Sequence, residues 1–205
     1  MTVRIKFCGI TRIEDAHAAA GLGVDALGLV FTRRSRRFVD VAQARAIRDV
    51  LPPFMNVVAL FMDDDPAWIE QVIAQVQPHL LQFHGSESAR HAERFARPYL
   101  KAIAMQGGDA HAVASEHAGA AGFLLDGHAP GAPGGAGRSF DWTHAPRLGR
   151  PVVLAGGLDA DNVARAIAVV RPYAVDVSSG IETSPGIKDA AAMRAFVEAV
   201  RAAAA

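Results

Sequence analysis

Short apolar runs alternate along this chain with longer amphipathic stretches. Eight of the runs have the length of strands and consist largely of β-branched and other apolar residues. They span residues 3–7, 26–31, 56–61, 80–83, 99–104, 122–125, 151–155 and 173–177. Each run is therefore predicted to form a strand.

Several of the stretches between these runs carry the capping residues of helices. Thr11 and Glu14 have the spacing of a capping box, Asp65-Pro66 is a typical helix start, and Asp159 is a predicted N-cap. The helices predicted in this way, together with one at the end of the chain, cover about 15–20, 67–76, 159–170 and 188–203. The fifth and sixth intervals, 107–119 and 127–137, are rich in glycine and small residues, so they are predicted to be short helices or loops.

Strands that alternate with helices imply parallel βαβ units, because a parallel neighbour needs a long crossover connection. Eight units in 205 residues fit a small closed (β/α)8 TIM barrel, whereas an open doubly wound sheet of about six strands would leave two strands unexplained. We therefore predict an α/β fold with one TIM-barrel domain over residues 1–205.

Charge and composition exclude some classes of partner. The chain has 21 basic and 21 acidic residues, so no overall field favours nucleic acid or an anionic membrane. It has no signal-like N-terminus and no apolar run long enough to span a bilayer. The single cysteine excludes an intramolecular disulfide, which favours a reducing compartment and predicts a cytoplasmic protein.

The residues that follow the predicted strands are unusually polar or glycine-rich. The carboxyl ends of the strands form the active-site rim of a TIM barrel, so these residues are candidates for a site. They include Cys8 after the first strand, Gln82 and His84 at the fourth, Asp126 at the sixth, Gly156-Gly157 after the seventh, and Asp176, Ser178, Ser179 and Gly180 at the eighth.

The glycines at this rim predict a phosphate site. Gly156, Gly157, Ser179 and Gly180 could present backbone N–H groups to an anion, and the glycine-rich segment around Gly135 could cover it. A single such loop is more often only a tight turn. Two adjacent loops together favour phosphate.

Cys8 and Asp126 are candidates for acid–base chemistry. A lone cysteine is more often an apolar filler, and an aspartate at a strand end is often a turn residue. Across one barrel mouth, however, a thiol and a carboxyl form a suitable pair for moving protons on a bound ligand.

Four arginines follow the second strand, Arg33, Arg34, Arg36 and Arg37. They are either a solvated loop or the source of one inward arginine that holds a ligand carboxylate. The histidines lack the spacing of a metal motif, and Cys8 has no thiol partner, so no metal site is predicted. His84 either lines the mouth beside Gln82 or caps the next helix.

Several motifs together resemble phosphoribosylanthranilate isomerase along the whole chain. They are Lys6-Phe-Cys-Gly-Ile-Thr-Arg12, Gln82-Phe-His-Gly85, Phe123-Leu-Leu-Asp126, Gly134-Gly-Ala-Gly-Arg-Ser-Phe-Asp-Trp142, Ala155-Gly-Gly-Leu158 and Val175-Asp-Val-Ser-Ser-Gly-Ile-Glu182. Residues 127–133 depart from the family pattern.

The resemblance implies an Amadori rearrangement of N-(5-phosphoribosyl)anthranilate without cofactor or metal, within tryptophan biosynthesis. It implies that Asp126 is the general acid, Cys8 the general base, and Arg37, or else Arg36, the group that binds the substrate carboxylate. These roles need the pKa of Asp126 to be raised and that of Cys8 to be lowered.

Two other functions fit parts of the sequence. One is another sugar-phosphate isomerase on the same fold, although the relative in histidine synthesis uses a carboxylate where this chain has Cys8. The other is a phosphate-metabolite binding protein without catalysis, which would need the glycine loops alone. The sequence leaves open whether the chain is a monomer or a homodimer.

Overall fold

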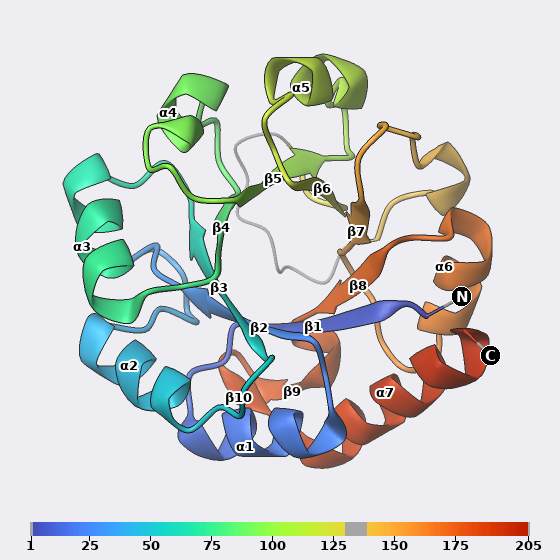
Figure 1. Cartoon of the computed structure of the whole chain (residues 1–205). Coiled ribbons are helices and arrows are strands. Elements are labelled where there is room, and N and C mark those ends of the chain that lie inside the picture. Colours follow the sequence, from blue (N-terminus) through green and yellow to red (C-terminus); the bar gives the residue numbers. More distant parts are fainter. Residues whose placement is uncertain (1, 130–138, 205) are drawn as a thin grey trace.

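Eight parallel strands form a closed barrel in the computed structural model, which describes residues 2–129 and 139–204. The ring closes because β1 (Arg4–Cys8) pairs with both β2 (Ala26–Val30) and β8 (Ala174–Val177). Between them in chain order lie β3 (Asn56–Phe61), β4 (Leu80–Phe83), β5 (Tyr99–Ala104), β6 (Gly122–Asp126) and β7 (Val152–Leu154). The predicted TIM barrel is thus confirmed, and helices surround the ring of strands (Figure 1).

Seven α-helices are described around the strands. They are α1 (Ile13–Leu22), α2 (Val41–Asp49), α3 (Pro66–Val76), α4 (Ala89–Glu93), α5 (Ala110–Glu116), α6 (Val163–Val170) and α7 (Ala190–Ala204). As predicted, the fifth helix is short, with 7 residues. Between β6 and β7 the described residues form the 3-10 turn η1 (Trp142–His144), and most of the predicted sixth interval, residues 130–137, lies outside the described residues.

Two predicted helix starts are wrong. The N-cap of α1 is Arg12, because the Thr11 hydroxyl donates instead to the carbonyl of Gly186. Asp159 accepts hydrogen bonds from the N–H groups of Asp161 and Asn162 in a turn, so α6 begins only after Asn162. In both cases a tertiary or turn contact takes the side chain that the local pattern assigned to a cap.

The predicted start of the last helix is also displaced. Residues after β8 form the 3-10 turn η2 (Ser179–Ile181) and an antiparallel pair, β9 (Glu182–Ser184) with β10 (Ile187–Lys188). Lys188 therefore belongs to this hairpin, and α7 begins at Ala190. The carboxylate of Asp189 accepts from the N–H groups of Ala191 and Ala192 at that helix start.

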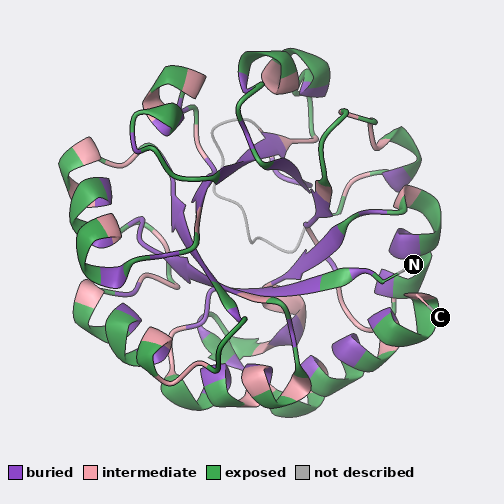
Figure 2. Cartoon of the chain, in the orientation of Figure 1, coloured by how far each residue is buried: buried purple, intermediate pink, exposed green. Residues whose placement is uncertain are grey.

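Side chains alternate between the two faces of each strand, and both faces are buried. One set packs outward against the helices, as Phe7, Phe61 and Phe83 do in the main core. The other set fills the barrel interior, where Leu100 and Leu124 belong to a separate apolar cluster. Figure 2 shows the resulting buried ring of strands inside helices that are exposed on their outer sides.

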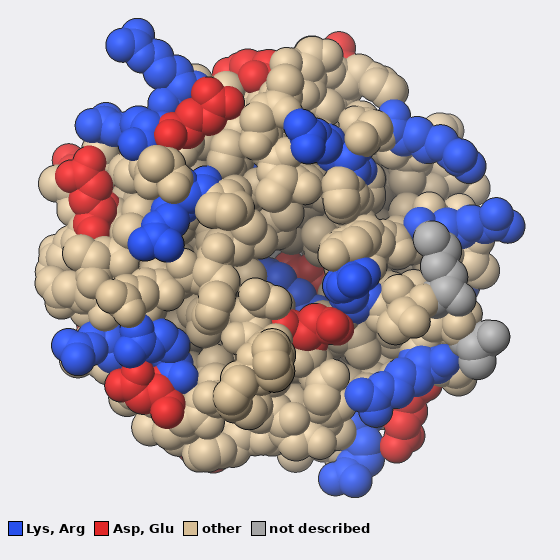
Figure 3. All heavy atoms as spheres, in the orientation of Figure 1, with Lys and Arg blue, Asp and Glu red and all other residues tan. Residues whose placement is uncertain are grey.

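The outer surface carries both signs of charge. Acidic and basic side chains are interspersed over the face seen in Figure 3. Among the described helices, none has the length and apolar character needed to cross a membrane. In a barrel of this kind, a site is expected at the rim formed by the carboxyl ends of the strands.

Candidate active site

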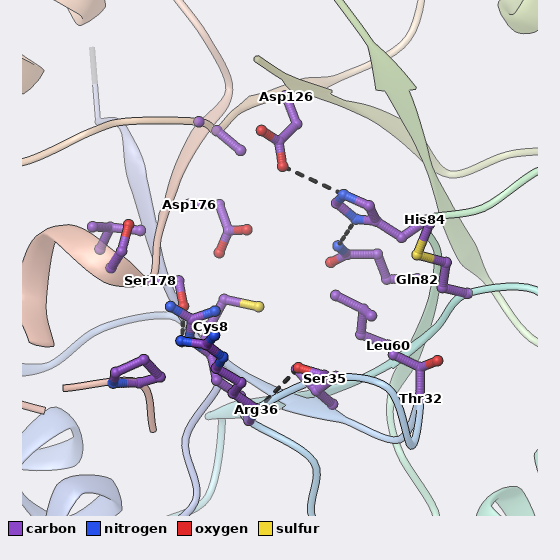
Figure 4. Close-up of a pocket in the computed structure, with 18 of the residues that line it drawn as sticks. Cys8, Thr32, Ser35, Arg36, Leu60, Gln82, His84, Asp126, Asp176 and Ser178 are labelled. Carbon is purple, nitrogen blue, oxygen red and sulfur yellow. Dashed lines mark hydrogen bonds and ion pairs between the residues drawn. The ribbon is translucent and has the colours of Figure 1, made fainter. Parts of the chain in front are cut away.

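A cavity of about 530 Å³ opens at the carboxyl ends of the strands. Its lining includes most of the candidates taken from the strand ends: Cys8, Arg36, Arg37, Gln82, His84, Asp126, Gly156, Gly157, Asp176, Ser178 and Ser179. Gly180 lies beside this lining in η2, and Gly135 lies outside the described residues. Figure 4 shows Cys8 and Asp126 on opposite sides of the cavity, with Asp176 between them.

Cys8 ends β1 and points into the cavity next to two charged side chains. Lys6, two residues earlier, is on the same face of the strand, and its Nζ lies 2.8 Å from Oδ1 of Asp176. Gly28 on the adjacent strand leaves the space that the thiol occupies, because a Cβ there would lie 2.9 Å from Sγ. The thiol is thus enclosed by strand residues on both sides.

The buried ion pair beside Cys8 affects its titration. Burial acts to lower the pKa of Lys6, but the interactions with Asp176 and Cys8 together outweigh it, so the pKa of Lys6 is raised. Burial also raises the pKa of the Cys8 thiol, and the positive charge of Lys6 only partly opposes that rise. The expected lowering of the Cys8 pKa is therefore wrong for the free protein.

Asp126 ends β6 and faces two imidazoles. Nε2 of His84 lies 3.3 Å and Nδ1 of His128 lies 3.5 Å from its Oδ2. The two rings stack with centroids 4.7 Å apart. On its other side His84 contacts Gln82, whose Nε2 lies 3.1 Å from Nδ1 of the ring. His84 therefore lies between an amide and the carboxylate.

The pKa of Asp126 is also contrary to expectation. Burial acts to raise it, but the contacts with His128 and His84 outweigh burial and hold the pKa of this carboxyl well below its usual range. In the free protein the carboxyl is therefore ionised while the Cys8 thiol keeps its proton. The sequence did not predict this lowering of the Asp126 pKa, because His128 was not among the candidate residues.

Arg37 is held by a carboxylate from the hairpin after β8. Its Nε and Nη2 donate to the two oxygens of Glu182 at 2.8 and 2.7 Å. Lys188 donates to the same carboxylate at 2.7 Å and also to the backbone carbonyl of Cys8. Arg36 is exposed and borders the cavity. A ligand carboxylate would therefore meet one arginine already oriented by Glu182 and one on the open side.

The glycine loops after β7 and β8 come together at the mouth of the cavity. Gly156 and Gly157 both have left-handed backbone, with φ of 85° and 65°, which turns the chain sharply after β7. Gly180 packs against the carbonyl of Leu158, where any Cβ would clash. The loops after β7 and β8 are therefore in direct contact, as a shared anion site requires.

Comparison with known proteins gives the family. A family model described as N-(5'phosphoribosyl)anthranilate (PRA) isomerase matches residues 5–199. The N-(5'-phosphoribosyl)anthranilate isomerase of Pseudomonas aeruginosa PAO1 is 55% identical over 201 residues, which are 97% of this chain and 95% of that protein. The chain belongs to the phosphoribosylanthranilate isomerase family. It is accordingly an isomerase of tryptophan biosynthesis.

Solved structures of phosphoribosylanthranilate isomerases have the same fold. The Thermus thermophilus enzyme superposes with a TM-score of 0.88 at 37% identity, covering 98% of this chain and 99% of that one. A second isomerase structure, in complex with reduced 1-(o-carboxyphenylamino)-1-deoxyribulose 5-phosphate, has a TM-score of 0.83 at 35% identity and covers 98% and 100%.

Some side chains in and around this cavity were not predicted from the sequence. Lys6 could have been found from its spacing of two from Cys8, which puts both on one strand face. His128 stands in a segment that departs from the family pattern, so no motif pointed to it. Glu182 and Lys188 belong to a hairpin whose contact with Arg37 spans more than 140 positions, and no local pattern predicts such a contact.

Proposed function

We propose that this chain converts N-(5'-phosphoribosyl)anthranilate into 1-(2-carboxyphenylamino)-1-deoxyribulose 5-phosphate, with Asp126 as general acid and Cys8 as general base. The observation that carries the proposal is that a thiol and a carboxyl line one cavity from β1 and β6. The complex of a related isomerase with the reduced product supports the same substrate class. The whole chain, 1–205, is proposed to act as one domain in the cytoplasm.

In the first step Asp126 gives its proton to the ring oxygen of the ribose. The C1–O bond breaks as the nitrogen lone pair forms a C=N bond, so the furanose opens to a protonated Schiff base. The Cys8 thiolate then removes the proton from C2, and the electron pair flows toward nitrogen to form an enolamine. Its tautomerisation, with a proton returned to C1, gives the ketose.

In the free protein the proton is on Cys8, whereas the proposed chemistry needs it on Asp126. The reactive form has the proton on Asp126 and a thiolate at Cys8, whereas the free protein favours a carboxylate and a thiol. Both forms contain the same number of protons. Transfer of one proton from the thiol to the carboxyl therefore generates the reactive form without a change in net charge, and the positive charge of Lys6 stabilises the thiolate.

Groups that line or border the cavity are suited to both anionic ends of the proposed substrate. Arg37, oriented by Glu182, is proposed to bind the anthranilate carboxylate, with Arg36 as the alternative. The phosphate is proposed to lie on the backbone of Gly156, Gly157, Ser179 and Gly180, with Gly135 remaining a prediction from sequence. Gln82, His84, Asp176 and Ser178 complete the proposed lining. These contacts would hold C1 and C2 between the acid and the base.

The decisive experiment follows the loss of phosphoribosylanthranilate fluorescence with purified protein. Cys8→Ala and Asp126→Asn should each lower kcat by about 10²- to 10⁴-fold, the usual contribution of an acid or base, while affinity for the reduced product is kept. Asp161→Asn, an exposed change in the turn before α6, is the control. Turnover near the wild-type rate in either variant would remove the role proposed for that residue.

A further inference from the structure

His84, Asp126 and His128 converge at the ends of β4 and β6. Each offers one ligand atom, and the three atoms lie within 4.8 Å of one another. Nε2 of His84 is 3.3 Å and Nδ1 of His128 is 3.5 Å from Oδ2 of Asp126. Two imidazoles and a carboxylate are a common donor set for Zn²⁺ and related ions.

The spacing of these atoms matches the coordination shell of such an ion. With metal–nitrogen and metal–oxygen distances of about 2.0–2.2 Å, neighbouring ligands of a tetrahedral Zn²⁺ are roughly 3.3–3.5 Å apart. Both observed distances to Oδ2 are in this range. The remaining distance, between the two histidine nitrogens, is within 4.8 Å, and ion binding would need the ring of His128, in the turn after β6, to move closer to His84.

The ring nitrogens aimed at Asp126 lack good hydrogen bonds. Only 8% of His84 and 7% of His128 is exposed, yet Nε2 of His84 and Nδ1 of His128 have no hydrogen-bond partner of acceptable geometry among the described residues. Buried polar atoms normally have such partners. Two buried nitrogens that are directed at one carboxylate without such partners are therefore available as ligands for a cation.

Gln82 can fix the required tautomer of His84. To bind an ion through Nε2, the ring must carry its proton on Nδ1. Half a turn of the Gln82 amide places Oε1 where Nε2 now lies, 3.1 Å from Nδ1, so that it accepts this proton. The same turn gives a partner to Oε1, which has none in the described residues. Such an outer hydrogen bond is typical of metal-binding histidines.

We propose that His84, Asp126 and His128 form a binding site for a transition-metal dication of the Zn²⁺ class, and that an ion bound there inhibits the isomerase. Asp126 and His84 line the cavity, so the ion can enter from it and retain a water as fourth ligand. The metal site stands on its own geometry, whereas inhibition rests on the proposed role of Asp126, because a metal-bound carboxylate cannot deliver a proton.

Binding is tested on the full-length chain after dialysis against EDTA, by titration with ZnCl₂ in a calorimeter and with CoCl₂ by visible absorption. The wild type should bind Zn²⁺ and show the intense spectrum of tetrahedral Co²⁺. Loss of an outer partner of a metal ligand costs about 10- to 100-fold in affinity, so loss of the ligand itself in His128→Ala should cost about 100-fold or more. His128→Gln, which keeps the approximate size of the side chain, should lose Zn²⁺ affinity to a similar extent.

Two control variants make the test specific. His111→Ala removes an exposed histidine of α5 and should leave Zn²⁺ affinity unchanged. Cys8→Ala tests the other strong ligand in the cavity and should also leave it unchanged. Unchanged affinity in both His128 variants, or loss of binding in Cys8→Ala instead, would overturn the site.

Inhibition is a separate readout. Zn²⁺ should lower isomerase turnover of the wild type, EDTA should restore it, and both His128 variants should keep their own metal-free rates at the same Zn²⁺ concentration. Zn²⁺ bound through His128 without inhibition would overturn the inhibitory part alone. If the protein binds Zn²⁺ but has no isomerase turnover at all, the proposed function fails and the metal site remains.

Discussion

Cys8 and Asp126, the proposed base and acid, are held in the free protein in the protonation state opposite to the one that the proposed mechanism uses. The imidazoles of His84 and His128 hold the carboxyl ionised, and burial holds the thiol protonated. This arrangement protects the thiol, since only the thiolate is a strong nucleophile. The reactive fraction is small, but between the two pKa values it does not depend on pH.

This protonation state predicts a broad pH profile. The active fraction falls when pH drops through the low pKa of Asp126, where both groups are protonated, and again when pH rises through the raised pKa of Cys8, where both are ionised. The ratio kcat/KM should therefore vary little between about pH 5 and about pH 8 apart from ionisation of the substrate.

Steady-state kinetics across that range checks the prediction, with Cys8→Ser as the reference for substrate ionisation. Serine does not ionise in this range, so the alkaline decrease should be missing from that variant. An alkaline decrease centred at or below about pH 8 in the wild type would contradict a raised thiol pKa.

Gly28 determines where the Cys8 thiol lies. In Gly28→Ala the new Cβ would lie 2.9 Å from Sγ and 3.0 Å from Nζ of Lys6, so the thiol and the amine must both move. Because a misplacement of about 1 Å can cost about 10²-fold in rate, kcat should fall by about tenfold or more with little change in KM.

Kinetics of the two alanine variants Gly28→Ala and Gly21→Ala measure this effect. Gly21 lies within α1 with nothing near its missing Cβ, so its substitution should keep the rate and stabilise the fold by about 0.5–1 kcal/mol. A wild-type kcat in Gly28→Ala would show that the position of the thiol is not critical.

The hairpin of β9 and β10 links the loop after β2 to the ends of β1 and β8. Glu182 accepts from Arg37 and from Lys188, while Lys188 also donates to the carbonyls of Cys8 and Ser178. The side chains of Glu182 and Lys188 are 4% and 0% exposed. One carboxylate thus neutralises two cations beneath the cavity and fixes the loop that follows β2.

Substitution of Glu182 should therefore destabilise the protein. Glu182→Gln leaves Arg37 and Lys188 without their counter-charge, which for a buried pair costs about 3–5 kcal/mol of unfolding free energy. Urea unfolding at pH 7 measures the loss, with Glu198→Gln on the exposed side of α7 as the control. Equal stability of the two variants would contradict the buried ion pair.

The stabilisation that Glu182 gives to the fold should also depend on pH. Burial acts to raise the pKa of Glu182, but Arg37 and Lys188 outweigh it and lower that pKa. A carboxyl with a lowered pKa stabilises the fold above its unfolded pKa and loses this contribution as pH falls through the folded value. The difference between wild type and Glu182→Gln should therefore shrink as the pH is lowered below about 4.

The starts of the helices show why a local sequence pattern predicts a cap correctly only in some cases. Asp65 caps α3 as predicted, because its side chain accepts from the N–H of Ala67 and no distant group among the described residues competes for it. Thr11 had the same kind of sequence signal, but Gly186, far along the chain, takes its hydroxyl. Capping residues are thus reliable only where no distant group competes for them.

The whole barrel depends on closure between its first and last elements. β1 pairs with β8, and α7 packs against α1 and α6 on the outside. Phe196 of α7 is fully buried and meets Phe7 of β1 with ring centroids 6.2 Å apart. This contact lies where the two ends of the chain are brought together.

Removal of the Phe196 ring should weaken the complete fold rather than one segment. Phe196→Ala should lower the unfolding free energy by about 3–5 kcal/mol, the usual cost of a deleted buried phenyl ring. Phe54→Ala, where the ring is fully exposed, should change it by less than about 0.5 kcal/mol. Circular dichroism and tryptophan fluorescence should report the same midpoint, and separate transitions would contradict closure as one cooperative unit.

The strands and their parallel order follow from the alternation of apolar runs with amphipathic stretches, and eight such strands in a chain of this length favour a closed barrel in which both faces of each strand are buried. The strand-end rule likewise brings Cys8, His84 and Asp126 to one cavity. The protonation of that cavity depends instead on contacts between distant positions: Lys6 with Asp176, Glu182 with Arg37, and His128 with Asp126. Electrostatic energies vary with distances of a few ångströms and with burial, and neither quantity is present in a linear pattern.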